Sequence, residues 1–194
     1  MNTRRNFIKS TAVAGAGLSV ANSVFGSPLF LTGPEKIKVG IIGVGERGRS
    51  LLGLLLNRDD VEVTAICDIE PITLGKAQKQ FTDKGKTEPQ IFTGDDHAYR
   101  ALLDLKELDG VLICTPWRLH FKMAVDTMNA GKYVGLEVCG AQTIQQCWDL
   151  VDTHEKTGSH LYFMENVCYR RDVIAVMNMV RQDLFGELIH LEGG

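Results

Sequence analysis

Six residues near the start of the chain have the glycine spacing of a phosphate-binding turn. The segment Gly-Val-Gly-Glu-Arg-Gly at residues 43–48 directly follows the apolar run 37–42 and opens a stretch with leucines at helical spacing. In this context Gly43 permits a tight turn, Gly45 lets the backbone approach a pyrophosphate, and Gly48 lets the helix pack closely on the strand. The first helical turn offers free N–H groups to phosphate oxygens. The motif predicts a dinucleotide site, with a glycine-rich turn that binds nothing as the alternative.

An acidic residue ends the next apolar run. Asp68 directly follows residues 61–67 and stands about 20 residues after the glycine motif. A carboxylate at the end of a second strand accepts hydrogen bonds from the ribose hydroxyls and repels the extra phosphate of NADP. Asp68 therefore predicts NAD as the cofactor, and the alternative is an exposed aspartate in a turn.

A second polar segment, Thr-Pro-Trp-Arg-Leu-His at residues 115–120, follows the apolar run 110–114. The carboxyl ends of parallel strands meet at the edge where doubly wound sheets bind ligands. Trp117 offers a flat apolar surface to a ring, and His120 comes one helical turn later. We expect cofactor contact here, against the alternative that His120 caps a helix or lies on its surface.

The cysteines do not have the spacing of a metal or thiol site. Their number is odd, and they form neither a CxxC pair nor a zinc pattern: Cys67, Cys114, Cys139, Cys147 and Cys168. Cys67 and Cys114 stand near the ends of Val/Ile-rich runs, where buried thiols that pack in strands are expected. We assign no metal and no thiol catalysis.

The elements that must position these residues alternate from Lys36 onward. Apolar runs predict strands at residues 37–42, 61–67, 90–92, 110–114, 133–137, 160–165 and 187–192. Amphipathic stretches predict helices at residues 47–57, 71–84, 96–104, 117–129, 143–157 and 170–182. This alternation is typical of an α/β fold, in which a doubly wound parallel sheet is covered by helices on both faces.

The N-terminal segment has the order of an export signal. Arg4 and Arg5 precede a weakly apolar, Gly- and Ala-rich run at residues 11–20 and a small-residue segment at residues 21–27. The arginine pair resembles the twin-arginine type, which implies the twin-arginine export machinery as a partner and a periplasmic location. The run is too short and too glycine-broken for a stable membrane span. A basic tail on a short helix, an uncleaved anchor and a lipid attachment remain alternatives.

These observations predict four segments. They are a signal peptide at residues 1–26, a linker at 27–35, an NAD-binding domain at 36–165 and the start of a second α+β domain at 166–194. The last expected strand stands alone next to Gly194, and a single strand is not stable by itself, so we expect this second domain to be truncated. The net charge of −3 disfavours nucleic acid as a partner. The sequence leaves open whether the protein forms a homo-oligomer.

The glycine motif, the Thr-Pro…His segment and Glu137 at the end of the next strand resemble the Gfo/Idh/MocA oxidoreductases, over essentially all of residues 36–194. The resemblance implies a Rossmann-type fold. Most of that family have Glu-Lys-Pro after this strand, and the lysine looks like a proton-transfer group. Residues 137–140 are instead Glu-Val-Cys-Gly, without a lysine. The difference disfavours an ordinary sugar dehydrogenase, which stays the first alternative.

Three segments, at residues 137–140, 165–173 and 186–194, are similar to glycoside hydrolase family 109. Its members are NAD-dependent retaining glycosidases, with α-N-acetylgalactosaminidase the named activity. With the motif glycines, the resemblance implies cofactor contacts by Gly43, Gly45, Glu46, Arg47, Gly48, Asp68, Trp117, Arg118, Leu119, His120, Glu137, Val138 and Asn166. Alternatively, Glu137 caps a helix and Asn166 holds a turn. Catalytic side chains are expected after Gly194.

The resemblance also implies a mechanism unlike the usual pair of carboxylates. NAD would oxidise the carbon-3 hydroxyl of a small glycoside substrate, and elimination of the leaving group, water addition and re-reduction would follow. The cofactor would end unchanged. The chain by itself would supply only the cofactor half and be inactive, and the second alternative is a catalytically inactive binding module.

Overall fold

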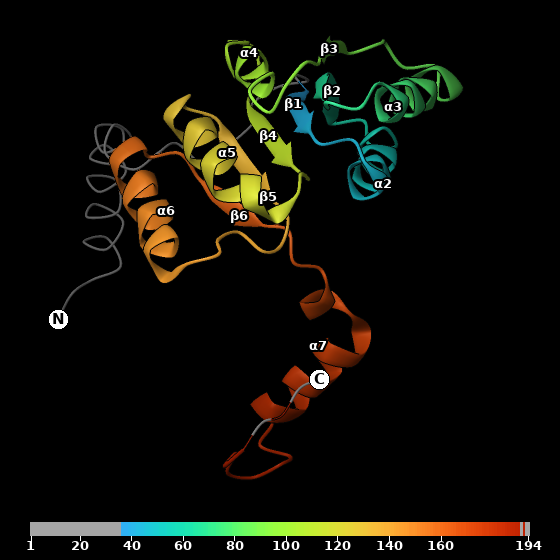
Figure 1. Cartoon of the computed structure of the whole chain (residues 1–194). Coiled ribbons are helices and arrows are strands. Elements are labelled where there is room, and N and C mark those ends of the chain that lie inside the picture. The colour runs from blue at the N-terminus through green and yellow to red at the C-terminus, as the bar shows by residue number, and fades with distance from the viewer. Residues whose placement is uncertain (1–35, 191, 193–194) are drawn as a thin grey trace, which may run out of the picture.

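A computed structural model describes residues 36–190 and residue 192 (Figure 1). The expected signal peptide at residues 1–26 and the linker at residues 27–35 lie outside the described residues.

The centre of the structure is a six-stranded, all-parallel sheet in the order β3-β2-β1-β4-β5-β6. The strands are β1 (Ile37–Ile42), β2 (Val61–Cys67), β3 (Gln90–Phe92), β4 (Gly110–Ile113), β5 (Tyr133–Leu136) and β6 (Leu161–Phe163). The chain order reverses between β1 and β4, which makes this the point where a doubly wound sheet opens a crevice for ligands. The expected α/β class is confirmed, and the later strands are slightly shorter than their apolar runs.

Helices connect the strands. They are α2 (Glu46–Leu55), α3 (Pro71–Asp83), α4 (Tyr99–Leu103), α5 (Trp117–Asn129) and α6 (Ile144–Thr157), followed by the 3₁₀ turn η2 (Val167–Tyr169) and α7 (Arg171–Arg181). The termini of α6 follow from its sequence. The Thr143 side chain accepts the N–H of Gln146, and Gly158 ends the helix with a φ of 71°. Figure 1 shows α7 extending away from the sheet, and none of its residues is buried.

Two expectations about elements are wrong. The helix expected at residues 96–104 begins only at Tyr99, because Asp95 accepts the N–H of His97 and holds the preceding residues in a turn. Residues 187–190 and 192 do not form the expected strand. A strand needs a neighbour for its backbone hydrogen bonds, and within the described part of the chain these residues have none.

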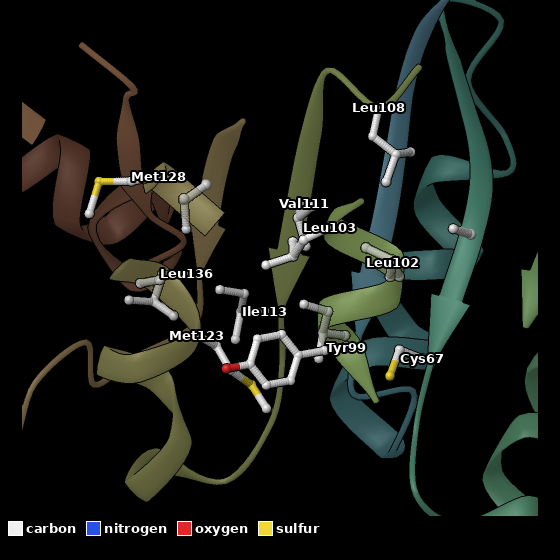
Figure 2. Packing of buried hydrophobic residues seen from close by; sticks show 14 of the residues in the cluster. Cys67, Tyr99, Leu102, Leu103, Leu108, Val111, Ile113, Met123, Met128 and Leu136 are labelled. Atoms are coloured by element: carbon white, nitrogen blue, oxygen red, sulfur yellow. The ribbon is translucent and has the colours of Figure 1, made fainter. Parts of the chain in front are cut away.

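Buried apolar side chains form two clusters on opposite faces of the sheet, since successive strand residues point to opposite sides. Ile41 and Ile66 pack with Leu52, Leu74 and other residues beneath α2 and α3. The alternate positions of the same strands pack beneath α4, α5 and α6 (Figure 2). The two layers of helices hold the strand ends, and therefore the turns that follow them, in fixed positions.

Candidate functional site

A cavity of about 380 Å³ lies at the carboxyl edge of the sheet. The last residues of β1 and β2 and the segments that follow β1, β2, β3 and β4 supply its lining: Ile42, Gly43, Gly45, Glu46, Arg47, Cys67, Asp68, Ile69, Asp95, Asp96, Tyr99, Cys114, Thr115, Pro116, Arg118, Leu119 and Met123. This is the position at which sheets of this topology bind nucleotides.

The glycine turn is shaped by contacts that exclude side chains. Gly43 has a φ of 86°, and a Cβ there would lie 2.7 Å from the carbonyl oxygen of Cys114. A Cβ on Gly48 would overlap the carbonyl oxygen of Gly43, whereas one on Gly45 would meet no atom within 4 Å. Gly43 and Gly48 are therefore required by the protein's own packing. Gly45 instead keeps open a space beside the cavity.

The first turn of α2 offers backbone donors to this space. The helix has Gly45 as its N-cap, without a side-chain hydrogen bond at the cap. The first hydrogen bond at the N-terminal end of α2 runs from the Arg49 N–H to the Gly45 carbonyl. In any α-helix the N–H groups of the first turn lack an intrahelical partner, so those before Arg49 can donate to phosphate oxygens, and the helix dipole favours negative charge there.

Asp68 joins the end of β2 to the glycine turn. One carboxylate oxygen accepts the Val44 N–H at 2.7 Å and the other accepts the Glu70 N–H at 3.0 Å. The backbone N–H of Asp68 itself donates to Phe92 at the end of β3. A carboxylate has about four acceptor positions, so Asp68 keeps capacity for ribose hydroxyls while it fixes the turn.

Arg47 and Glu137 meet across the same edge. The Arg47 Nε lies 2.7 Å from the Glu137 Oε1, and the two side chains are 43% and 11% exposed. The sequence implicated both residues in cofactor binding, but their spacing of 90 residues gave no sign that they pair.

The Trp117–His120 segment divides between the cavity and the core. Arg118 and Leu119 line the cavity, and Arg118 forms an ion pair of 3.1 Å with Asp96. His120 is 1% exposed, with its ring nitrogens 2.6 Å from the Thr115 carbonyl and 2.7 Å from the Cys139 carbonyl. Its ring therefore ties the end of β4 to the segment after β5, and contact of the segment with the cofactor stays a prediction.

The structure does not bring every expected residue to the cavity. Trp117, Val138 and Asn166 are exposed and do not line it, and Gly48 and Glu137 are buried and are not among the lining residues. Asn166 stands before the 3₁₀ turn η2 without a side-chain hydrogen bond at the cap, and Glu165 instead accepts the Val167 N–H. Cofactor contacts of these residues stay predictions.

The sequence reasoning missed lining residues after β2 and β3. These are Ile69, Asp95, Asp96 and Tyr99, together with Met123 on α5. The signal was available for Asp95 and Asp96, because they follow a predicted strand at the same edge. Tyr99 carries no such signal: its hydroxyl donates to Asp126 on α5, and burial raises its pKa to about 12.

The thiols at the cavity are protonated near neutral pH. Burial is the main cause that raises the pKa of both Cys67 and Cys114 to about 12.

Among residues 36–190 and 192 there is no group of three or more His, Cys, Asp or Glu side chains that could hold a metal ion. In the same part of the chain, no helix has the length and apolarity that a membrane crossing needs.

The fold and the cavity define an NAD-binding Rossmann domain. The family model for Gfo/Idh/MocA proteins, described as the oxidoreductase family with an NAD-binding Rossmann fold, matches residues 37–165, and the chain belongs to this family. NAD is the cofactor of this domain, as the sequence predicted. Scyllo-inositol dehydrogenase from Lactobacillus casei, solved with bound NAD(H) and scyllo-inositol, has the same fold, with a TM-score of 0.68 and 19% identity over 79% of this chain and 43% of that one.

Within this family the particular resemblance is to the N-terminal portion of glycosyl hydrolase family 109 proteins. A model of the C-terminal domain of that family matches residues 169–194. The chain is 46% identical to a glycosyl hydrolase family 109 protein of Stenotrophomonas maltophilia, over 98% of this chain and 41% of the relative. It is 41% identical to an α-N-acetylgalactosaminidase of Tannerella forsythia, over 97% and 44%. The chain thus spans less than half the length of these relatives.

Proposed function

We propose that the complete protein is an NAD-dependent retaining glycosidase that acts on α-linked N-acetylgalactosaminides. The observation that carries the proposal is an NAD site followed by Glu-Val-Cys-Gly in place of the Glu-Lys-Pro that is typical of Gfo/Idh/MocA oxidoreductases. Similarity to family 109 on both sides of residue 169 supports it.

The residues of this chain fit the cofactor and hold it. The N–H groups at the start of α2 would donate to the pyrophosphate, and the space beside Gly45 would admit its approach. Asp68 would accept hydrogen bonds from the adenosine ribose. When bound, NAD supplies a hydride acceptor for the sugar's carbon-3 hydroxyl and returns the hydride at the end of the cycle.

The substrate chemistry follows from the carbon-3 ketone. The ketone acidifies the proton on carbon 2, so that elimination expels the glycosidic leaving group and water then adds to the unsaturated sugar. The acid/base side chains for these steps belong to the part of the relatives' length that this chain does not span. Accordingly, the 194-residue chain alone should not cleave aryl glycosides.

A conventional sugar dehydrogenase is the competing function, since the family is named for oxidoreductases. It would need a proton-transfer group at the position where Gfo/Idh/MocA oxidoreductases typically have lysine. Val138 holds that position and is 42% exposed and apolar, so it cannot exchange a proton. A dehydrogenase would also consume one NAD per turnover, whereas the proposed glycosidase regenerates it.

We expect the complete protein to cleave an aryl α-N-acetylgalactosaminide without net formation of NADH and to leave a 3-deoxy analogue intact. The analogue lacks the hydroxyl that must be oxidised. Turnover of the ordinary substrate in deuterated water should place deuterium on carbon 2, which mass spectrometry of the product measures. Cleavage of the 3-deoxy analogue at the normal rate would exclude the mechanism and leave the NAD site unaffected.

We also propose that residues 1–26 direct twin-arginine export to the periplasm. Arg4 and Arg5 support this, and a compartment without free NAD suits an enzyme that keeps its cofactor. Changing both arginines to lysine should abolish export of a fused reporter while its synthesis continues, as measured by cell fractionation. Undiminished export of the double variant would contradict the twin-arginine assignment.

A further inference from the structure

The ion pair between Arg47 and Glu137 links the two sides of the cofactor crevice. Arg47 is the second residue of α2 and lies within the glycine motif at residues 43–48, and Glu137 directly follows β5. The end of β4 lies between them in the sheet order. The contact of 2.7 Å therefore spans the carboxyl edge of three strands.

The glutamate is the fixed member of the pair. Its backbone N–H donates to the Ile113 carbonyl of β4 at 3.1 Å, and its side chain is only 11% exposed. The Arg47 side chain is longer, 43% exposed, and part of the cavity lining. Glu137 consequently determines where the guanidinium of Arg47 lies.

Only one edge of that guanidinium is used. Within the part of the chain that the structure describes, its sole hydrogen bond is from Nε to Glu137. The Nη1 and Nη2 groups remain as a planar fork, which is the geometry that binds two phosphate oxygens at once. Free phosphate-binding N–H groups of α2 lie in the same helical turn.

We propose that Glu137 is a positioning residue that holds the Arg47 fork toward the pyrophosphate of NAD. The proposal rests on NAD binding alone and not on the glycosidase chemistry. It assigns the effect of Glu137 to the phosphates and not to a direct contact with the nicotinamide half. Glu137 should then matter equally for NAD and for ADP, and it should not matter for adenosine.

The pair also keeps the crevice electrically balanced. If Arg47 alone were lost, the nearly buried Glu137 carboxylate would stay unpaired beside the pyrophosphate, and like charges repel. Loss of Glu137 should therefore add no further weakening when Arg47 is already replaced. This dependence of one residue on the other distinguishes positioning from two independent contacts.

The test compares Kd values of NAD, ADP and adenosine by titration calorimetry on the complete protein after cofactor removal. In Glu137→Ala we expect NAD and ADP each to bind about tenfold more weakly, as for the loss of one charge-assisted hydrogen bond. The Kd of adenosine should not change. Glu137→Gln keeps an acceptor for the Arg47 Nε and should stay close to the parent. Adding Glu137→Ala to Arg47→Gln should not weaken ADP binding further.

Asp83→Ala is the matched control, because Asp83 forms an ion pair of the same 2.7 Å length with Lys79 on the exposed face of α3. It should leave all three Kd values unchanged. If Glu137→Ala does not fold, Arg47→Lys tests the same fork and should weaken ADP about tenfold with adenosine unchanged. The proposal is overturned if Glu137→Ala weakens NAD but not ADP, weakens adenosine as well, tightens ADP, or adds its effect to that of Arg47→Gln.

Discussion

Alanine in place of Gly48 is expected to abolish measurable NAD binding and to destabilise the domain. The added Cβ would overlap the carbonyl oxygen of Gly43 and lie 3.0 Å from its carbonyl carbon, so α2 would have to move away from the glycine turn. Overpacking of this kind costs about 3 kcal/mol, and the higher helix propensity of alanine offsets only about 1 kcal/mol. The displacement would also move the helix N–H groups that we propose bind the pyrophosphate. Thermal unfolding and NAD titration measure the two effects.

Gly45→Ala is expected to separate these two effects. Its Cβ would meet no protein atom within 4 Å and its φ is −60°, so the loss of stability should be limited to the cost of alanine at a helix N-cap, about 1 kcal/mol. The same Cβ would occupy the space through which a pyrophosphate approaches the backbone, and NAD affinity should fall about 100-fold, as for the loss of about 3 kcal/mol.

Gly75→Ala on α3 provides the control for both variants. A Cβ there also meets no atom within 4 Å, but the site is a helix interior far from the glycine turn in sequence. It should stabilise the domain by about 0.5–1 kcal/mol and leave NAD binding unchanged. Normal NAD affinity of Gly45→Ala would contradict the assignment of this turn to the pyrophosphate.

Asp68→Ala is expected to remove the preference for NAD over NADP, by about 100-fold in the ratio of the two affinities. A carboxylate beside the ribose gains hydrogen bonds from the diol and repels a 2′-phosphate, and like-charge contacts cost several kcal/mol. The structure adds a second effect. Because Asp68 also accepts the N–H groups of Val44 and Glu70, its loss should loosen the glycine turn and weaken both cofactors.

Asp68→Asn distinguishes charge from hydrogen bonding. The amide removes the negative charge and keeps one acceptor oxygen, so only one of the two backbone N–H groups retains its partner. NADP should gain affinity relative to NAD, with a smaller general loss than in Asp68→Ala. Titration of each variant with both cofactors gives the ratios. A parent protein that binds NAD and NADP equally would refute the role of Asp68.

The sequence by itself determined the sheet and the principal binding turn, because both depend on short-range patterns. Continuous apolar runs mark strands buried on both faces, and the alternation with amphipathic helices fixed the α/β class. The glycine motif is also local, because its glycines are needed by residues close to them in sequence. The turn itself gives Gly43 its positive φ and brings the Gly43 carbonyl close to Gly48. The resemblance to a family added expected cofactor contacts, such as Glu137 and Asn166, that no local pattern indicates.

Contacts between distant segments could only come from the tertiary structure. The pairing of Arg47 with Glu137 and the binding of the Val44 N–H by Asp68 join residues 90 and 24 positions apart. His120, expected at the cofactor, has both ring nitrogens on backbone carbonyls because α5 turns its ring into the core. The strand expected at 187–192 was wrong since an apolar run becomes a strand only beside a partner. The periodicity of apolar residues predicts which face of a helix or strand a side chain lies on. Which residues it contacts depends on how the helices and strands pack together.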